Sequence, residues 1–288
     1  MESSTHEASP RHLLAIHAAV LLFGLAGLFG KWVVLPATIL VLGRVFFAAL
    51  SLGIFLRWRQ MPFHLHRRAD YYHLLLLGLL LALHWVTFFR SIQLSTVAIG
   101  LLTFSTFPIF TAFLEPLFFR ERLQARDLLL ALVTFAGVAL VIPSYSLQDA
   151  LTRGALWGIA SGATFAVLSI LNRRYVQQYP SLVIAFYQDL SATAALLPFF
   201  FVLQPVIGGR EWVLLALLGV VFTALSHTLF IGGMKSVKAS TASVIGALEP
   251  VYGIVAAALL LQETPSWQVV LGGLIILAAT AYATLRPR

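Results

Sequence analysis

The chain has 288 residues, of which 60% are hydrophobic and only 10% are charged. Soluble domains carry about 25% charged residues, so this composition excludes a soluble globular enzyme and a disordered protein. The absence of cysteine excludes disulfides, thiolate metal ligands and a catalytic cysteine. The net charge of +8 comes without a soluble basic domain, so nucleic acid is not an expected partner. The composition is that of an integral protein of the lipid bilayer.

Ten apolar segments follow one another along the chain, each close to the ~20 residues that a helix needs to cross a bilayer. Charged residues and Pro/Gly pairs separate them, and the connections are too short for a catalytic domain. Residues 74–81 do not alternate between apolar and polar types, which favours helices over barrel strands. The predicted spans are 13–31, 36–56, 72–92, 97–118, 127–143, 154–172, 181–203, 211–233, 240–261 and 266–285.

The distribution of Lys and Arg predicts how the chain crosses the membrane. One side, which holds both termini and alternate loops, carries 14 of the 19 basic residues, and the other side carries four. Basic residues favour the cytoplasmic side. We therefore expect both termini in the cytoplasm, with residues 1–12 as a short polar tail. The first apolar run is too long for a signal-peptide core and lacks a cleavage site, so we expect it to be retained.

The two halves of the sequence align at one constant offset, close to half the chain length, which we call the repeat offset. Each half holds five predicted spans, and an odd number makes the second half enter the membrane from the opposite side. Such inverted repeats are typical of secondary transporters. The alternative is a chance similarity of two Leu-rich halves. The expected repeats are 13–143 and 154–285, and the matched pairs are Phe23/Phe165, Lys31/Arg173, Phe88/Phe230, Pro108/Pro250 and Glu121/Glu263.

Several local patterns occur in a recognisable order. In SVKASTASVIGALEPVYGIVAAALLLQE, residues 236–263, a run of small residues leads to Glu-Pro and Leu-x-Glu closes the segment. LGRVFFAAL, residues 42–50, places an arginine in the second span, and Pro108 with FFRER, residues 118–122, echoes the second half. In order and spacing, over essentially the full chain, these features resemble the drug/metabolite transporter superfamily and within it the EamA-type exporters.

This resemblance implies an all-α integral membrane protein, in which two inverted five-helix repeats form a basket of ten transmembrane helices around a central cavity. It implies a secondary transporter of the bacterial inner membrane that exports or exchanges small metabolites by alternating access. Aromatic and other hydrophobic amino acids are prominent substrates of such proteins, and no cofactor is expected. The short loops permit a functional monomer. The first half departs from the family pattern because Phe107, not glutamate, precedes Pro108.

Arg44, Asp189 and Glu249 fall deep inside predicted spans. A charge at the bilayer centre costs roughly 2.5–3.5 kcal/mol on insertion scales, so each is a functional candidate. Arg44 and Glu249 are expected at similar depth, where either could contact a substrate carboxylate or ammonium group, and Glu249 could take part in proton coupling. The alternative is a buried structural ion pair, which we favour for Arg44 and Asp189.

Two prolines and a set of aromatic, hydroxyl and histidine side chains complete the expected site. Pro108 and Pro250 should kink their spans, as hinges or as passive kinks. Aromatic surface with a few hydroxyl groups suits a flat apolar ligand, although most of the 22 Phe must face lipid or core. Histidine can shuttle protons, bind a ligand or simply pack. The predicted substrate-binding residues are His84, Trp85, Phe88, Thr103, Phe107, Trp157, Ser161, Thr164, His227, Glu249 and Tyr252.

Other functions are less well supported by the sequence. The loop with His64, His66 and His73 is basic and has only Asp70 as a carboxylate, so it is better read as a cytoplasmic loop than as a metal site. No paired aspartates, HExxH or Ser/His arrangement indicates an intramembrane enzyme, and no GxxxxGK[ST] loop indicates a primary pump. A passive facilitator or channel is poorly separated from a carrier, although no ring of like charges is present.

Overall fold

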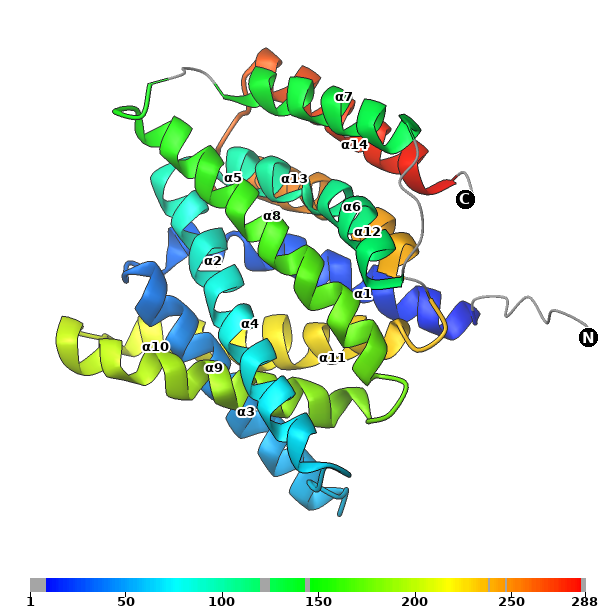
Figure 1. Cartoon of the computed structure of the whole chain (residues 1–288). Coiled ribbons are helices and arrows are strands. Elements are labelled where there is room, and N and C mark those ends of the chain that lie inside the picture. Colours follow the sequence, from blue (N-terminus) through cyan, green and yellow to red (C-terminus); the bar gives the residue numbers. More distant parts are fainter. Residues whose placement is uncertain (1–8, 120–124, 143–145, 238, 247, 286–288) are drawn as a thin grey trace, which may run out of the picture.

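The computed structural model describes residues 9–119, 125–142, 146–237, 239–246 and 248–285, and within these ranges all regular structure is helical (Figure 1). Seven helical stretches are long and apolar enough to cross a membrane. Three shorter apolar helices cover Leu129–Val141, Glu249–Leu260 and Trp267–Ala279. The prediction of an all-α membrane protein is thus confirmed. The predictions for residues 1–8 of the tail and for Glu121 lie outside the described residues.

Each of the ten predicted spans contains helix, either continuous or broken. The helices are α1 (Pro10–Ala26), α2 (Phe29–Trp32), α3 (Ala37–Trp58), α4 (Arg68–Leu94), α5 (Val97–Phe104), α6 (Phe107–Phe119), α7 (Ala125–Val141), α8 (Ala150–Tyr175), α9 (Ser181–Leu203), α10 (Gly209–Gly219), the π-helix η1 (Val220–Leu225), α11 (Ser226–Gly233), α12 (Ala239–Gly246), α13 (Glu249–Leu260) and α14 (Trp267–Leu285).

Two spans are broken at equivalent places. One break separates α5 from α6 and the other separates α12 from α13, and the repeat offset carries the helix ends of the first break onto those of the second. Pro108 and Pro250 are the second residues of α6 and α13, where the missing N–H of proline is tolerated. The expectation that each proline kinks a continuous span was therefore wrong, because one helix ends before the proline and the next begins at the residue that precedes it. The hinge role stays a prediction.

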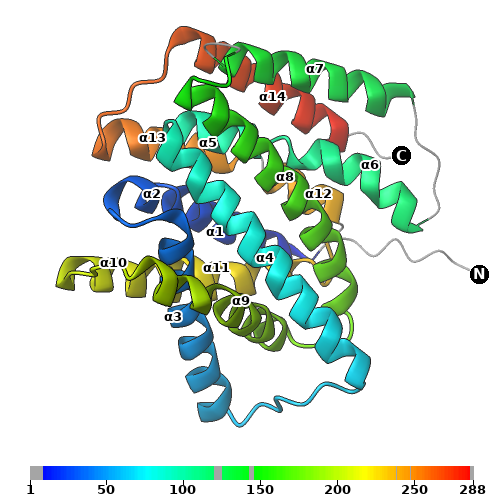
Figure 2. The same ribbon diagram turned by 60° about the vertical axis from the view of Figure 1, so that its left-hand side comes forward.

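Helices from the two halves of the chain pack closely against each other. α3 packs on α9, α4 on α8, α1 on α11 and α7 on α14. The pair α7 and α14 lies side by side along one edge of the molecule, remote from α3 and α9 (Figures 1 and 2). The main apolar core draws its buried residues from α1, α3, α4, α5, α8, α9 and α11. The two halves consequently share one core.

The loops gather at two ends of the helix bundle. At the end where α1 begins, which we call the basic end, loop 59–67 meets loop 176–180 through a hydrogen bond from the His66 backbone N–H to the Tyr179 hydroxyl, 2.9 Å long. At the opposite end, which we call the Lys31 end, the Gln93 side chain donates a 2.8 Å hydrogen bond to the backbone oxygen of Leu35. The helices run between these two sets of polar contacts.

Candidate functional site

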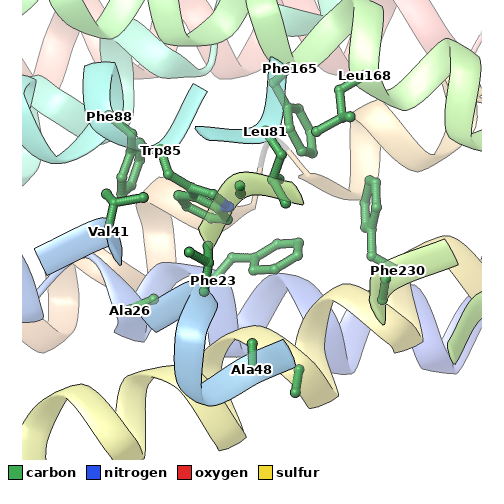
Figure 3. Packing of buried hydrophobic residues seen from close by; sticks show 14 of the residues in the cluster. Phe23, Ala26, Val41, Ala48, Leu81, Trp85, Phe88, Phe165, Leu168 and Phe230 are labelled. Carbon is green, nitrogen blue, oxygen red and sulfur yellow. The ribbon is translucent and has the colours of Figure 1, made fainter. Parts of the chain in front are cut away.

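Rings from six helices meet in the middle of the molecule. Neighbouring ring centroids lie 5.0–6.1 Å apart, in stacked, tilted and edge-on arrangements that aromatic pairs prefer. Figure 3 shows five of these rings, which come from α1, α4, α8 and α11. We call this group the aromatic core; it consists of Phe23, Trp85, Phe88, Phe104, Phe107, Phe165 and Phe230.

The aromatic core is closed in this structure. Phe88, Phe107 and the neighbouring Thr103, Ser161 and His84 have no accessible surface. These side chains leave nothing exposed to solvent, so at this point the rings occupy the place of the expected central cavity. A ligand could enter only if the helices moved apart.

Arg44, on α3, is fully buried beside the aromatic core. Its Nε donates a 2.9 Å hydrogen bond to Thr223 Oγ1, and its Nη2 donates a 3.4 Å hydrogen bond to the backbone oxygen of Phe222. The guanidinium carbon lies 3.5 Å from the centroid of the Trp85 ring, a close cation–π contact. Nη1 has no hydrogen-bond partner. One edge of the guanidinium is therefore held while another nitrogen is left unpaired.

The two residues that hold Arg44 belong to the π-helix η1. There the Thr223 hydroxyl donates a 2.8 Å hydrogen bond to the oxygen of Leu218, five residues earlier in the chain. A single π turn inside an α-helix is rare and is frequently found at functional sites. The turn is a feature that sequence reasoning missed, because no residue type in VVFTAL distinguishes it from an ordinary helical segment.

Asp189, on α9, is also fully buried, and neither of its carboxylate oxygens has a hydrogen-bond partner. Arg44 interacts electrostatically with Asp189 and with Glu249. Among the described residues, however, no ion pair within 4.0 Å joins Arg44 to either carboxylate. The structure thus holds a guanidinium and two carboxyl groups in one core without the direct contact that a structural ion pair needs.

Histidine and tryptophan nitrogens add to this unpaired polar set. His84 Nδ1 lies 2.9 Å from the Ser161 hydroxyl, while its Nε2 has no partner. Trp85 Nε1 and His227 Nδ1 are likewise buried without a hydrogen bond. Most buried polar atoms in proteins are paired, so several unpaired ones around a single arginine mark a place where a polar ligand could supply the missing bonds. The unpaired polar set is Arg44, His84, Trp85, Asp189 and His227.

Glu249 begins α13 and is only 3% exposed. A carboxylate in the first turn of a helix is stabilised by the positive end of the helix dipole. The backbone oxygen of Glu249 lies so near α1 that a Cβ added to Gly24 would be 2.7 Å from it. Helices α1 and α13, which come from different halves, therefore cross at close range beside this glutamate.

The structure brings most of the predicted residues together, but not all of them. His84, Trp85, Phe88, Thr103, Phe107, Ser161, His227 and Glu249 are buried in or around the aromatic core. Thr164 and Tyr252 are half-buried. Trp157 is 42% exposed and lies apart from the aromatic core, because its side of α8 faces outward.

Sequence reasoning also missed four rings of the aromatic core, namely Phe23, Phe104, Phe165 and Phe230. A signal for three of them was present. The repeat offset pairs Phe23 with Phe165 and Phe230 with Phe88. Both members of each matched pair therefore lie in the aromatic core, where Phe230 contacts Phe23 and Phe165. Phe104 has no such signal.

A profile described as the EamA-like transporter family matches the chain twice, over residues 11–142 and over residues 152–285. The chain belongs to the EamA-like transporter family. Membership confirms the resemblance seen in the sequence and places the chain in the drug/metabolite transporter superfamily, a group of multi-pass membrane transporters. The two matches cover nearly the same residues as the two repeats expected from the sequence.

Curated relatives of this EamA-like protein are named as transporters. It is 24% identical over 273 residues to "Uncharacterized transporter YxxF" of Bacillus subtilis, covering 93% of this chain and 88% of that protein. It is 30% identical over 197 residues to an "Uncharacterized transporter" of Archaeoglobus fulgidus, covering 68% and 70%. A solved crystal structure that is 18% identical has a TM-score of 0.71 and covers 97% of both chains, which shows a shared fold.

Proposed function

We propose that this EamA-like protein is a secondary transporter that exports or exchanges small metabolites, with aromatic or other hydrophobic amino acids as its foremost substrates. The observation that carries the proposal is the unpaired polar set around Arg44, beside the aromatic core. A core that serves only for packing leaves few buried polar atoms without a hydrogen bond. A binding site keeps such atoms available to form hydrogen bonds with its ligand. No cofactor and no metal enter the proposal.

The chemistry of the site supports a ligand with an apolar ring and a charged end. Arg44 offers Nη1 to a carboxylate, and it is already aligned by Thr223 and Trp85. The carboxylates of Asp189 and Glu249 are the available partners for an ammonium group. The rings of the aromatic core would stack on a flat side chain once the helices separate.

The membrane topology in this proposal has ten crossings, two inverted halves and cytoplasmic termini in the bacterial inner membrane. Three observations support it. The breaks in two spans are related by the repeat offset, the family profile matches once per half, and the helix pairs α3/α9 and α7/α14 each join equivalent spans. The pair α4/α8 likewise becomes the pair α11/α1 when the halves are exchanged. With the basic end in the cytoplasm, the positive-inside rule is satisfied.

The closed state of the aromatic core supports alternating access as the transport mechanism. The site lies between the basic end and the Lys31 end and is open to neither in this structure. Transport would require the halves to part at one end while they stay packed at the other. A permanently open channel would not need the buried rings to separate, so the packing favours a carrier over a passive facilitator.

The test is uptake into proteoliposomes that contain the purified protein. Labelled amino acids, nucleosides and sugars would be offered singly, with and without an imposed proton gradient. We expect saturable uptake of aromatic amino acids that excess unlabelled ligand blocks. Uptake of nucleosides or sugars instead would support a carrier with a different substrate class. No uptake of any solute by folded protein would contradict the transporter proposal.

A matched pair of variants separates the site from general effects. Trp85→Phe removes the Nε1 group and the strongest cation–π partner of Arg44, and Trp267→Phe makes the same change at a residue that is 68% exposed. We expect uptake to fall at least tenfold in Trp85→Phe and to stay at the parental rate in Trp267→Phe.

A further inference from the structure

A cluster of polar contacts, which we call the polar cluster, joins the two halves of the protein at the Lys31 end. Lys31 Nζ lies 3.8 Å from Glu263 Oε1 and donates a 2.6 Å hydrogen bond to the backbone oxygen of Ser95. Glu263 Oε2 accepts a 2.9 Å hydrogen bond from the backbone N–H of Val97. The polar cluster thus connects the end of the first span and the α4–α5 connection, both in the first half, to the segment after α13 in the second half.

The polar cluster lies where α1 and α13 would have to separate for the site to open at the Lys31 end. Lys31 lines a pocket of 420 Å³, Glu263 lines another of 220 Å³, and their ion pair lies between the two. Deeper along the same spans, Leu101 is fully buried and packs near Gly27 of the first half and Gly253 of the second. Separation of α1 from α13 would expose Leu101, and the ion pair opposes that separation.

We propose that Lys31 and Glu263 form a latch that holds the Lys31 end closed. Resting on the transport cycle proposed above, this latch would open whenever the Lys31 end opens. A partly exposed ion pair shifts an equilibrium only a few fold. Such a latch is therefore weak enough to open during transport, and reversing one of its charges converts attraction into repulsion.

The natural absence of cysteine allows a direct test. A Leu101→Cys variant would be labelled with a membrane-impermeant maleimide from the side that the Lys31 end faces. That side is established separately with Val34→Cys, since Val34 is 81% exposed at this end. In the Leu101→Cys background we expect Lys31→Glu and Glu263→Lys each to raise the labelling rate about threefold to tenfold. The exchanged pair, Lys31→Glu with Glu263→Lys, should return it towards the parental rate.

A control variant makes the test specific. Arg90→Glu makes the same charge change at an exposed residue of the Lys31 end and should leave the labelling rate unchanged. Equal labelling rates in all of these folded variants would overturn the latch. If Lys31→Glu and the exchanged pair behave as expected while the parent transports no solute, the latch stands and the proposed transport function fails.

Discussion

The guanidinium carbon of Arg44 lies 3.5 Å from the centre of the Trp85 ring, and these two residues come from neighbouring helices of the first half. The contact places a cation inside an apolar core without a carboxylate against it. Two hydrogen bonds to η1, in the second half, hold the same guanidinium. Arg44 therefore links the two halves and still keeps Nη1 unpaired for a ligand.

Replacing Arg44 by lysine should reduce transport at least tenfold with a folded yield close to the parental one. Lysine keeps the positive charge but lacks the planar guanidinium group. A single ammonium group cannot donate a hydrogen bond to Thr223, lie over the Trp85 ring and bind a carboxylate in the same geometry. Initial uptake rates, normalised to folded protein, check this. Arg57→Lys, at an exposed residue of α3, is the control. Parental uptake in Arg44→Lys would remove Arg44 from the site.

Glu249→Gln should impair transport more than it lowers the folded yield. The amide keeps the size of the side chain and loses the charge, so packing beside Gly24 is retained while ammonium binding or proton uptake is lost. Transport with and without a proton gradient distinguishes these two losses. Glu211→Gln, near the beginning of α10, serves as the matched control. The proposed role of Glu249 does not survive if its amide variant transports normally.

Gly24→Ala should destabilise the protein by about 1–3 kcal/mol, the typical cost of overpacking. The new Cβ would lie 2.7 Å from the Glu249 backbone oxygen and 3.1 Å from the Gly253 nitrogen, neither of which can rotate away. Gly209→Ala is the matched control because no atom lies within 4 Å of its added Cβ. Thermal unfolding in detergent measures both. Equal stability of the two variants would show that α1 and α13 do not pack closely at this crossing.

Tyr179→Phe should destabilise the basic end by about 1–3 kcal/mol, since a buried carboxylate loses a donor. The Tyr179 hydroxyl donates a 2.5 Å hydrogen bond to Asp70, and Asp70 is only 7% exposed. Burial, and then this hydrogen bond, raise the pKa of Tyr179 above its ordinary value of 10.0. The stabilisation is complete below pH 10 and is lost as the pH rises through the higher pKa of the folded state.

Unfolding of the parent and of Tyr179→Phe should be compared at neutral pH and at pH values above 10. The difference in their free energies of unfolding should shrink as the pH rises, because only the parent contains the ionisable hydroxyl. A difference that stays constant with pH would show that the tyrosine acts through packing alone.

The sequence predicted the helices well because each span is recognised by the hydropathy of its residues, averaged over a stretch long enough to cross a bilayer. The sequence also predicted that His84, Trp85 and Phe88 share one site. These residues lie on the same helix, α4, so their spacing and their depth in the membrane can be read from that helix alone. These predictions needed no knowledge of which helix lies opposite.

The features that the sequence did not predict depend on which helices and side chains pack against each other. Trp157 has the same residue type as Trp85, and only the packing of α8 decides that one is exposed and the other buried. The pairing of Arg44 with the hydroxyl and backbone of η1 depends on a π turn that hydropathy does not show. The closed aromatic core depends on the position of one half relative to the other, which a repeat offset does not fix.

The two helix breaks leave part of the polarity of the centre in the backbone itself. Within a helix, the carbonyl oxygens of Phe104 and Gly246 would accept hydrogen bonds from the residues four positions later, which are Pro108 and Pro250 and have no N–H. The Phe104 oxygen lies beside Gly162, where an added Cβ would be 2.8 Å away. Side-chain substitution can strip every hydroxyl and charge from the centre, but it leaves these two carbonyl dipoles in place. These two acceptors therefore belong to the chain path at the breaks, and only a change in that path, not a change of side chain, would remove them.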